Sequence, residues 1–322
     1  MKTATVIIVG GGPAGATCAR ELARHGTDVL ILDKAVFPRT KLCAGWITPR
    51  VLADLELDPA DYPHRLLTYR RIVFYIKGVP VLVPTHQYSI RRFEFDDFLL
   101  KRAGVPVDSH RVRNIRRAGS KYVIDDAYQC TYLVGAGGTH CPVYKSLFSG
   151  IHPRDPGRCI ATAEKEFAWQ WQDPQCRLWF FDRGLPGYAW YVPKQNGYLN
   201  VGIGGKLASL KKRGETINTH WTRFAGKLAR KGLTDNRRLA PKGHIYYLRG
   251  ASDAVCRENA FILGDAAGLA TRDMGEGIGP AIESAKLAAR AITTDTRYSV
   301  KSVTQWSAPQ ILAGRFASRS FE

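Results

Sequence analysis

The sequence contains no long hydrophobic run. No stretch reaches the ~18 consecutive apolar residues that a bilayer-spanning helix needs, so no transmembrane helix is expected. The first residues, MKTATVIIVGGG, join a short apolar run directly to a glycine turn, a pattern that does not fit a signal peptide. Internal repeats and low-complexity linkers are absent as well. The 322 residues, of which 45% are hydrophobic, are expected to form about two globular domains.

Disulfide and metal-ligand patterns are also absent. Seven cysteines are an odd number, and none belongs to a CxxC pair. This argues against a disulfide framework or a zinc ribbon and favours a reducing, cytoplasmic environment. The eight histidines form no HxH or HExxH pattern, so no metal site is expected.

Acidic residues are few. Aspartate and glutamate total 28 against 47 lysines and arginines, which gives a formal net charge of +19. One interpretation is an anionic partner, namely nucleic acid, an acidic lipid surface or a phosphorylated ligand, and the other is a solvated basic surface. No nucleic-acid motif accompanies the basic residues, so nucleic acid is not an expected partner. Peripheral contact with an anionic membrane, on its inner face, stays open.

A glycine-rich turn lies near the start of the chain. Residues 5–9 (TVIIV) form an apolar, β-branched run typical of a buried parallel strand, and a helical pattern follows from Pro13. The GxGxxG between them allows a tight turn, close approach of a pyrophosphate and close packing of helix on strand. Asp33 closes a second buried strand, where an acid accepts ribose hydroxyls and favours FAD or NAD over NADP. The predicted contacts here are Gly10, Gly12, Pro13, Ala14, Gly15, Asp33 and Lys34.

The pattern along the rest of the chain alternates between two kinds of structure. A helix is predicted at residues 92–102, and residues 160–205 carry the aromatic side chains and turn signals of antiparallel strands. Residues 207–231 are helical and basic, and a buried strand at 260–263 precedes a long helix from about Gly279. Short strands are predicted near residues 105–107, 111–115, 122–124 and 132–134.

These elements predict a discontinuous domain organisation. The FAD-binding domain is expected at residues 1–65, 88–150 and 250–295. The substrate domain, with an aromatic-rich antiparallel sheet, is expected at 66–87 and 151–249. Residues 296–322 form a C-terminal segment in which no motif is found.

A second glycine-rich segment distinguishes FAD from NAD. FILGDAAG (261–268) and GEGIG (275–279) resemble the second flavin motif of FAD oxidoreductases. Asp265 would accept a ribityl hydroxyl, and the glycines would bring the N-terminus of the following helix towards the flavin N1 and C2 carbonyl. The predicted contacts in this segment are Gly264, Asp265, Gly275, Gly277 and Ile278.

Four further segments carry a family resemblance. PRTKLCAG (38–45) resembles a PxxKxCGG loop, and RFEFDDFL (92–99) resembles an RxxFDxxL helix. LVGAGGTHCPV (133–143) resembles an ADGxxSxV segment, and YAWYVPK (188–194) resembles a YxWxFPK motif. Over roughly residues 5–290 the chain thus resembles flavoproteins of the geranylgeranyl reductase family. The resemblance implies an α/β fold in which a Rossmann-like FAD-binding domain is interleaved with an antiparallel β-sheet substrate domain, as in p-hydroxybenzoate hydroxylase.

The resemblance also implies cofactor contacts in the loop and helix motifs. In this family the loop passes near the flavin ring, so a thiol at Cys43 would donate a proton or gate access. The alternative is a small buried residue that fills the turn. Ala44 replaces a glycine of the loop, and Gly137 replaces an aspartate that helps to bind FAD and NAD(P)H in the hydroxylases. The contacts implied are Lys41, Cys43, Ala44, Gly45, Arg92 and Gly137.

Substrate contacts are predicted on the YAWYVPK strand. By strand alternation Tyr188, Trp190 and Val192 share one face, which would wall a pocket for an apolar substrate. Plain sheet core is the alternative for these three side chains. Tyr188 and Trp190 join Cys43 as catalytic candidates. Arg272 stands where many relatives have proline, and it would bind flavin or substrate or face solvent.

The chemistry implied is reduction. A single GxGxxG leaves no second dinucleotide domain, so the electron donor would be transient NAD(P)H or a reduced electron-carrier protein. The resemblance implies an FAD-dependent reductase that adds hydride from flavin N5 to carbon–carbon double bonds of an isoprenoid or other lipid. One alternative is a monooxygenase or halogenase that uses a C4a-hydroperoxide, since YAWYVP is close to the WxWxIP signature of halogenases. The other is a non-catalytic flavin-binding module.

Overall fold

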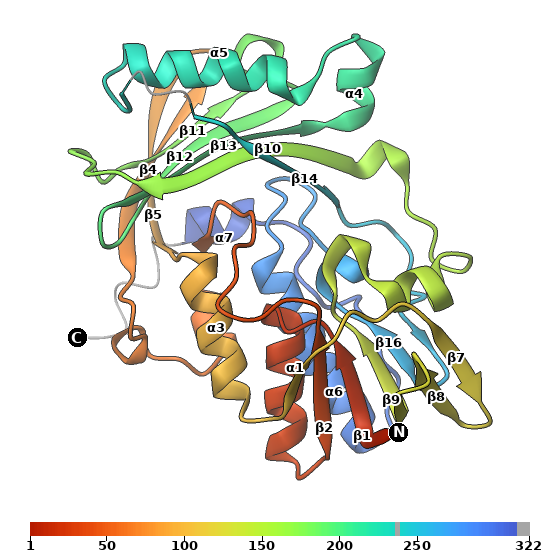
Figure 1. Cartoon of the computed structure of the whole chain (residues 1–322). Helices are drawn as coiled ribbons and strands as arrows, with labels where there is room; N and C mark the ends of the chain where they lie inside the picture. The colour runs from red at the N-terminus through yellow and green to blue at the C-terminus, as the bar shows by residue number, and fades with distance from the viewer. Residues whose placement is uncertain (236–238, 314–322) are drawn as a thin grey trace. The chain divides into compact units, whose positions relative to one another are not determined.

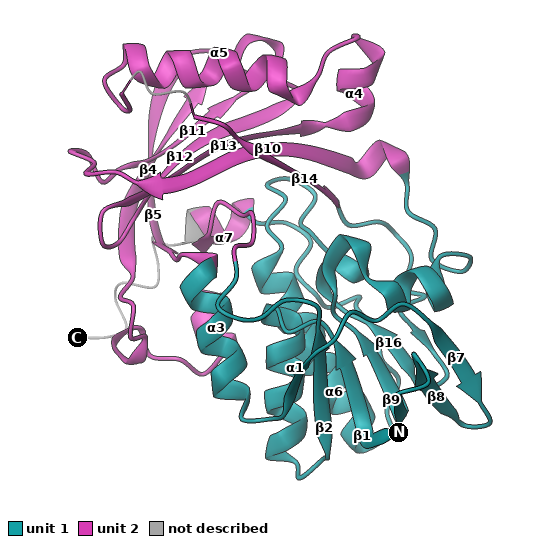
Figure 2. Cartoon of the chain, in the orientation of Figure 1, with its two compact units in different colours: residues 1–39, 93–155, 247–307 teal, residues 40–92, 156–246, 308–322 magenta. Residues whose placement is uncertain are grey.

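A computed structural model describes residues 1–235 and 239–313, and its internal contacts divide the chain into two compact units (Figure 2). Unit 1 comprises residues 1–39, 93–155 and 247–307, and unit 2 comprises residues 40–92, 156–246 and 308–322. Unit 2 thus takes in residues 40–65, which the sequence analysis assigned to the FAD-binding domain, because strand β3 (Trp46–Ile47) pairs with strand β5 (Val79–Ser89). Residues 236–238 and 314–322 of the expected substrate domain and C-terminal segment lie outside the described residues.

Unit 1 is built on a mainly parallel sheet with the strand order β15-β16-β9-β1-β2-β6 (Figure 1). Its central strands carry buried apolar runs, residues 6–9 of β1 (Lys2–Val9) and residues 29–32 of β2 (Val29–Asp33), as a sheet covered on both faces requires. A hairpin of β7 (Ile115–Ala118) and β8 (Lys121–Ile124) pairs with β9. The other strands are β1 (Lys2–Val9), β2 (Val29–Asp33), β6 (Val107–Ser109), β9 (Tyr128–Gly135), β15 (Cys256–Arg257) and β16 (Ala260–Ile262).

Two helices of unit 1 pack against each other. Helix α1 (Pro13–Arg24) buries Ala14, Cys18 and Leu22 on one face, as the sequence pattern predicted. Helix α6 (Ile278–Thr294) meets α1 with small residues that allow close approach of the two backbones. Helix α3 (Arg92–Ala103) starts at the residue predicted for it and ends one residue later.

Unit 2 is built on a second sheet with the order β14-β10-β13-β12-β11-β4-β5-β3. Neighbouring strands are antiparallel from β10 to β11, and β11 is parallel to β4. The strands not yet given are β4 (Leu67–Ile76), β10 (Cys159–Ala168), β11 (Cys176–Phe180), β12 (Gly187–Lys194), β13 (Tyr198–Lys206) and β14 (Lys242–Tyr247). The unit's helices are α2 (Pro49–Asp54), α4 (Leu207–Lys212), α5 (Ile217–Arg230) and α7 (Ala308–Ala313).

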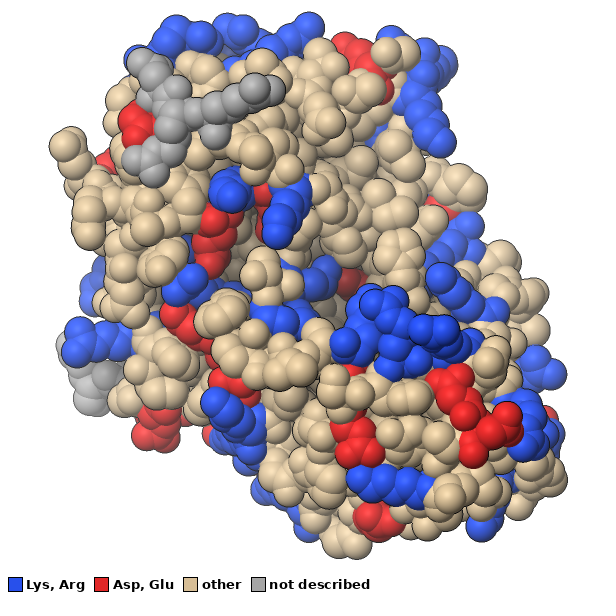
Figure 3. All heavy atoms as spheres, in the orientation of Figure 1, with Lys and Arg blue, Asp and Glu red and all other residues tan. Residues whose placement is uncertain are grey.

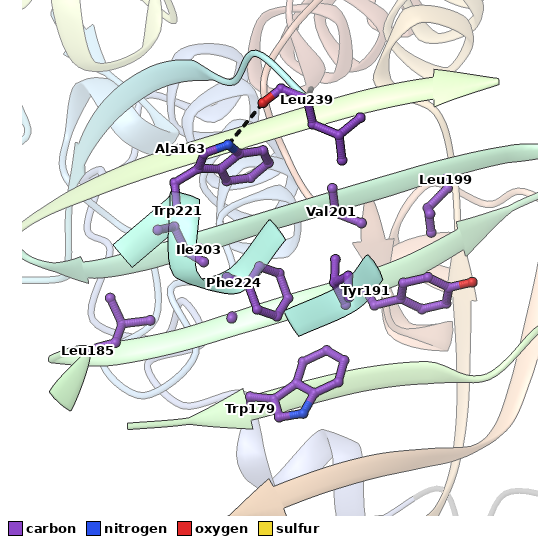
Figure 4. Packing of buried hydrophobic residues seen from close by; sticks show 12 residues of the cluster. Ala163, Trp179, Leu185, Tyr191, Leu199, Val201, Ile203, Trp221, Phe224 and Leu239 are labelled. Carbon is purple, nitrogen blue, oxygen red and sulfur yellow. Dashed lines mark hydrogen bonds between the residues drawn. The ribbon is translucent and has the colours of Figure 1, made fainter. Parts of the chain in front are cut away.

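The core of unit 2 lies between the sheet and α5 (Figure 4). Trp221 and Phe224 of α5 pack on Trp179, Tyr191 and neighbouring aliphatic side chains of the sheet. The indole N–H of Trp221 donates to the carbonyl of Leu239 at 3.0 Å, so its one polar atom is satisfied. Tyr191 and Trp179 therefore belong to the core face, and the side chains that alternate with them face the other way.

Most predicted elements are confirmed, with three differences. The strand predicted at residues 111–115 is wrong, because β7 begins only at Ile115. The helical stretch at residues 207–231 is two helices, interrupted at Gly214, whose φ of +64° ends α4. The long hairpin of β4 and β5 was not predicted as strands, since its apolar run contains Pro80 and Pro84.

Candidate functional site

Three turns of unit 1 meet at the carboxyl ends of parallel strands. Gly10 follows β1 with φ +114°, and a Cβ there would lie 2.5 Å from the carbonyl oxygen of Ala136, which follows β9. Gly264 follows β16 with φ +52°, and a Cβ there would lie 3.5 Å from the Cβ of Ala14. The two glycine motifs are about 250 residues apart in the sequence yet adjacent in this unit. This edge of a parallel sheet is where α/β proteins bind nucleotides.

The first glycine turn is open where a diphosphate is expected. Gly12 has extended backbone (φ −73°, ψ −174°) and precedes the N-terminus of α1. Among the described residues, a Cβ at Gly12 would meet only Arg39 Nη2, at 3.4 Å. A Cβ at Gly15 would instead lie 1.8 Å from the carbonyl oxygen of Gly10, so Gly15 is required by packing. The open backbone and the helix N-terminus fit the diphosphate of FAD.

Asp33 holds this turn from the end of β2. Its carboxylate accepts the N–H of Gly11 at 2.7 Å and the N–H of Ala35 at 2.9 Å. Each carboxylate oxygen retains a lone pair, so the group can still accept ribose hydroxyls. Lys34, which follows it, is exposed.

Arg39 is a candidate that the sequence analysis did not single out. Its Nη2 lies 3.2 Å from Oδ2 of Asp96, which is fully buried in α3, and its guanidinium lies 4.6 Å from the ring centroid of Phe37. These contacts hold a cation beside Gly12, where a diphosphate would gain from it. Asp96 belongs to the RxxFDxxL motif, whose first residue, Arg92, is buried at the start of α3.

The second glycine motif brings acids together at the N-terminus of α6. Oδ1 of Asp265 lies 3.2 Å from where a Cβ of Gly277 would be. Glu276 accepts the N–H of Gly279 at 2.6 Å, and burial raises its pKa to about 7. When Glu276 is protonated, it carries no negative charge, so the positive end of the α6 dipole is not neutralised as it would be by a carboxylate.

Arg154 joins two turns of this site and was also missed. It donates to the carbonyls of Thr139 and, at 3.2 Å, of Ala266, and its guanidinium lies 3.8 Å from the ring centroid of Tyr144. The turn that contains Thr139 follows Gly137, which is exposed. Arg154 thus links the turn that contains Thr139 to the turn that contains Ala266 and fixes the position of both.

In unit 2 the YAWYVPK strand holds the backbone of the Cys43 loop. Lys194 is fully buried, and its ammonium donates to the carbonyls of Ala44, of Gly45 at 3.0 Å and of Ile90 at 2.9 Å. Burial lowers the pKa of Lys194 to about 8. Gly45 has φ +63°, and a Cβ there would lie 2.2 Å from the carbonyl oxygen of Ile90. The lysine and the glycine together define the path of the loop.

Trp190 contacts the same loop through an asparagine. Its indole N–H donates to Oδ1 of Asn200 at 2.7 Å, and Nδ2 of Asn200 donates to the carbonyl of Cys43 at 3.2 Å. The indole lies flat over Gly202, where a Cβ would be 2.2 Å from the ring. This arrangement fixes the Cys43 carbonyl, in addition to the carbonyls that Lys194 binds.

An aromatic row continues along this face of the sheet. Ring centroids of Trp190 and Tyr188 are 5.8 Å apart, those of Tyr188 and Phe180 5.6 Å, and those of Phe180 and Phe74 5.3 Å. Tyr188 is half-buried, and Val192 is fully buried. Their role as substrate contacts stays a prediction.

A buried acid, Glu164 of β10, completes the surroundings of the loop. Its carboxyl group accepts the backbone N–H of Cys43, and burial raises its pKa to about 7 although Lys41 and Lys194 act in the opposite direction. Lys41 Nζ lies 2.9 Å from Nε2 of His244. Cys43 is half-buried, and its Sγ accepts the N–H of Gly45 at 3.3 Å.

Arg272 lies away from open solvent in unit 1. It is half-buried, donates to the carbonyl of Gly250 at 3.3 Å and lies 5.9 Å from the ring centroid of Trp306. These contacts hold it without a ligand, and its contact with flavin or substrate stays a prediction.

Neither a metal cluster nor a membrane-spanning helix is found in the described part of the chain. Residues 1–235 and 239–313 contain no group of three or more His, Cys, Asp or Glu side chains that could hold a metal ion. No helix within these ranges has both the length and the apolar character needed to cross a bilayer.

Comparison with known proteins identifies the cofactor and the family. Residues 5–94 match the family of FAD-dependent oxidoreductases. A menaquinone reductase of Mycobacterium tuberculosis is 28% identical over 98% of this chain and 81% of its own length. An uncharacterized protein of Methanosarcina barkeri is 30% identical over 93% of this chain and 77% of its own length. A digeranylgeranylglycerophospholipid reductase of Methanopyrus kandleri is 31% identical over 62% of this chain and 57% of its own length.

The chain is an FAD-dependent oxidoreductase of the same family as the Methanosarcina barkeri protein, and it is similar to flavoproteins of the geranylgeranyl reductase type. A solved geranylgeranyl bacteriochlorophyll reductase-like protein of Thermoplasma acidophilum has a TM-score of 0.75 at 21% identity, over 92% of this chain and 80% of that one. A solved flavin-dependent halogenase has a TM-score of 0.70 at 22% identity, and the match covers 92% of this chain and 59% of the halogenase. These likenesses confirm the p-hydroxybenzoate hydroxylase-like fold, and the match of residues 5–94 to the FAD-dependent oxidoreductases supports FAD as the cofactor.

Proposed function

We propose that this flavoprotein reduces carbon–carbon double bonds in the isoprenoid chain of a lipid. The observation that carries the proposal is the construction around the Cys43 loop, in which Lys194, Asn200 and Glu164 bind four consecutive peptide groups. Relatives named for menaquinone and for digeranylgeranylglycerophospholipid support an apolar isoprenoid substrate. The finer identity of that lipid belongs to the proposal.

The residues of unit 1 would bind and orient FAD. The open Gly12 backbone and the N-terminus of α1 would hold the diphosphate, with Arg39 as its counter-charge. Asp33 would accept the ribose hydroxyls, and Asp265 a ribityl hydroxyl. Reduced FAD, when bound, supplies the hydride.

The residues of unit 2 would hold substrate and proton. The row of Phe74, Phe180 and Tyr188 offers an apolar face that would exclude water from an isoprenoid chain. The thiol of Cys43 would donate the proton that reduction requires at the second carbon. Lys194 and Asn200 would keep this thiol in place by binding the carbonyl of Cys43 and the carbonyl of Gly45 that follows it.

The proposal is tested with photoreduced protein in the absence of oxygen. Addition of a geranylgeranyl lipid should restore the absorbance of oxidised flavin and add two hydrogens to its isoprenoid chain, as measured by mass spectrometry. With menaquinone, whose quinone ring also oxidises reduced flavin, the two hydrogens should be found on fragments of the isoprenoid chain. Acceptance of electrons from NAD(P)H or from a reduced carrier protein, measured by bleaching of the flavin, identifies the donor. Stable bound FAD with no turnover would instead support a non-catalytic flavin-binding module.

Oxygenase chemistry is the second candidate, favoured by the halogenase fold and the YAWYVP sequence. Rapid mixing of reduced protein with oxygen distinguishes the two. A reductase should return to oxidised flavin in a single phase, whereas an oxygenase should show an additional absorbing phase before that return. Halide- or oxygen-dependent modification of an aromatic substrate panel would contradict the reductase proposal.

We also propose that unit 2 makes a peripheral contact with anionic membrane. Ile76, Val79 and Leu82 of the β4–β5 hairpin are exposed, as is Phe181 beside it. Lys231 lies 5.8 Å from the ring centroid of Tyr75 in the same hairpin. Figure 3 shows lysine and arginine side chains gathered along α5, at the top of the view. Apolar insertion flanked by bases is the combination that binds acidic lipid surfaces.

Sedimentation with vesicles tests this contact. Binding to vesicles that contain phosphatidylserine should exceed binding to phosphatidylcholine vesicles and should fall with salt. Val79→Asp should weaken it about tenfold, whereas Val36→Asp, at an equally exposed position of unit 1, should not. Equal binding of both variants and both vesicle types would refute the contact.

A further inference from the structure

Glu164 is a buried acid whose hydrogen bond to the Cys43 loop does not by itself require an ionisable group. Its side chain is 3% exposed, and it lies on the same face of the sheet as Trp190 and Asn200. Gly202 stands between Glu164 and Trp190, and a Cβ there would be 2.8 Å from the Cβ of Glu164. An acid packed this tightly is retained at the cost of its own hydration, which points to a use for its proton.

The surroundings of Glu164 come from four elements. Its own strand carries Glu166, which pairs with Arg91 at 2.9 Å, and β12 carries Lys194. The loop brings Lys41 and Cys43, and β14 brings His244, which contacts Lys41. The carboxyl group accepts the N–H of Cys43, so carboxyl and thiol flank one peptide group. Lys41 and His244 form a polar connection from this pair towards the edge of the sheet.

We propose that Glu164 is the positioning residue that returns a proton to the Cys43 thiol after each turnover. The inference rests on the proposed reduction of a carbon–carbon double bond. In that reaction the π bond breaks, and reduced FAD, when bound, would supply the hydride for one carbon and become oxidised. The other carbon gains the proton of Cys43 as its S–H bond breaks. The thiolate then takes the proton of the Glu164 carboxyl group, and the carboxylate is reprotonated from solvent through His244 and Lys41.

Burial agrees with this use because it keeps the proton on Glu164 up to about pH 7. A carboxyl group in that range can both donate and regain a proton under ordinary conditions. Once ionised, it places a negative charge beside Cys43, whose sulfur gains negative charge when it attacks an alkylating reagent. The reactivity of the thiol therefore reports the charge state of Glu164 whether or not a substrate is present.

Alkylation of Cys43 by iodoacetamide, followed by peptide mass spectrometry, tests the inference. At pH 8, where wild-type Glu164 is ionised, Cys43 should be alkylated about tenfold faster in Glu164→Gln than in wild type. At pH 5.5 the two rates of Cys43 alkylation should be equal. The matched control is Glu166→Gln, which removes a carboxylate from the same strand and should change the rate less than about twofold. Identical profiles for wild type and Glu164→Gln would overturn the inference.

A second measurement separates the inference from the proposed function. Wild-type turnover should fall as pH rises through about 7, Glu164→Gln should be slow at every pH, and Glu164→Asp should recover the pH-dependent profile. If lipid is reduced but neither turnover nor alkylation depends on Glu164, the inference fails and the proposed function stands. If alkylation responds as expected but no variant reduces any lipid, the proposed function fails and only the coupling between the two groups remains.

Discussion

The two glycines of the first turn allow cofactor binding to be separated from folding. In Gly12→Ala the new methyl group meets only the end of the Arg39 side chain, at 3.4 Å, and the backbone is extended and suits any residue. The free energy of unfolding without cofactor should therefore change by less than about 0.5 kcal/mol. In Gly15→Ala the methyl group would lie 1.8 Å from the carbonyl oxygen of Gly10, far inside the ~3.5 Å of van der Waals contact. Backbone must move, and we expect a loss above about 4 kcal/mol.

The same pair of variants should behave differently towards FAD. The methyl group of Gly12→Ala occupies the open face where the diphosphate is expected, and displacing the diphosphate would weaken about two charged hydrogen bonds. A loss of about 3 kcal/mol corresponds to a dissociation constant about 100-fold higher. Urea unfolding of the cofactor-free protein and fluorescence titration with FAD measure the two quantities. Wild-type FAD affinity in Gly12→Ala, or a large loss of its stability without cofactor, would refute the assignment of the turn.

Further expectations concern the loop, the buried acid and the counter-charge. Gly45→Ala should lower the free energy of unfolding by more than about 3 kcal/mol, because φ is +63° and the Cβ would lie 2.2 Å from the carbonyl oxygen of Ile90. Gly78→Ala, with φ +85° and open space around it, should lower it by only about 1 kcal/mol. Similar losses in the two variants would contradict the close packing of the Cys43 loop at Gly45. Burial raises the pKa of Glu164 from 4.5 to about 7, so the folded protein binds the extra proton and stability falls as pH rises between these values. Glu164→Gln should remove about 2 kcal/mol of that fall in urea unfolding at pH 5 and pH 7.5, and an unchanged difference would show that Glu164 does not titrate there. Arg39→Ala should weaken FAD binding about tenfold and reduce its salt dependence, and an unaltered salt dependence would argue against a counter-charge.

Local patterns were sufficient to predict the nucleotide-binding part of the fold. The turn from Gly10 to Gly15 and the acid at Asp33 follow from contacts within one strand–turn–helix unit, so the spacing alone reveals them. Arg39 and Arg154 were missed because their partners, Asp96 and Ala266, are distant in the sequence. The aspartate of the RxxFDxxL motif, Asp96, was a signal in the sequence for this pair, because a buried acid needs a cation such as Arg39.

The second sheet was harder to predict for the opposite reason. The segment IKGVPVLVPT (76–85) is almost uniformly apolar, so it lacks the alternation that marks a half-buried strand, and its prolines argue against one. Strand alternation correctly placed Trp190 and Val192 on one face. That face turned out to hold the Cys43 loop through Asn200, a hydrogen bond across two strands that no spacing rule contains.

The central claim is that this flavoprotein adds hydrogen to an isoprenoid double bond with a proton drawn from the Cys43 loop. The most direct measurement mixes photoreduced protein with a geranylgeranyl lipid in deuterated water without oxygen, and follows flavin absorbance and the mass of the lipid together. We predict that the flavin becomes oxidised and that each saturated bond gains two deuteriums, because the hydrogen on N5 of reduced flavin exchanges with solvent as the thiol proton does; both changes should be much slower in Cys43→Ala. Lipid of unchanged mass beside flavin that stays reduced, or equal rates in wild type and Cys43→Ala, would contradict it.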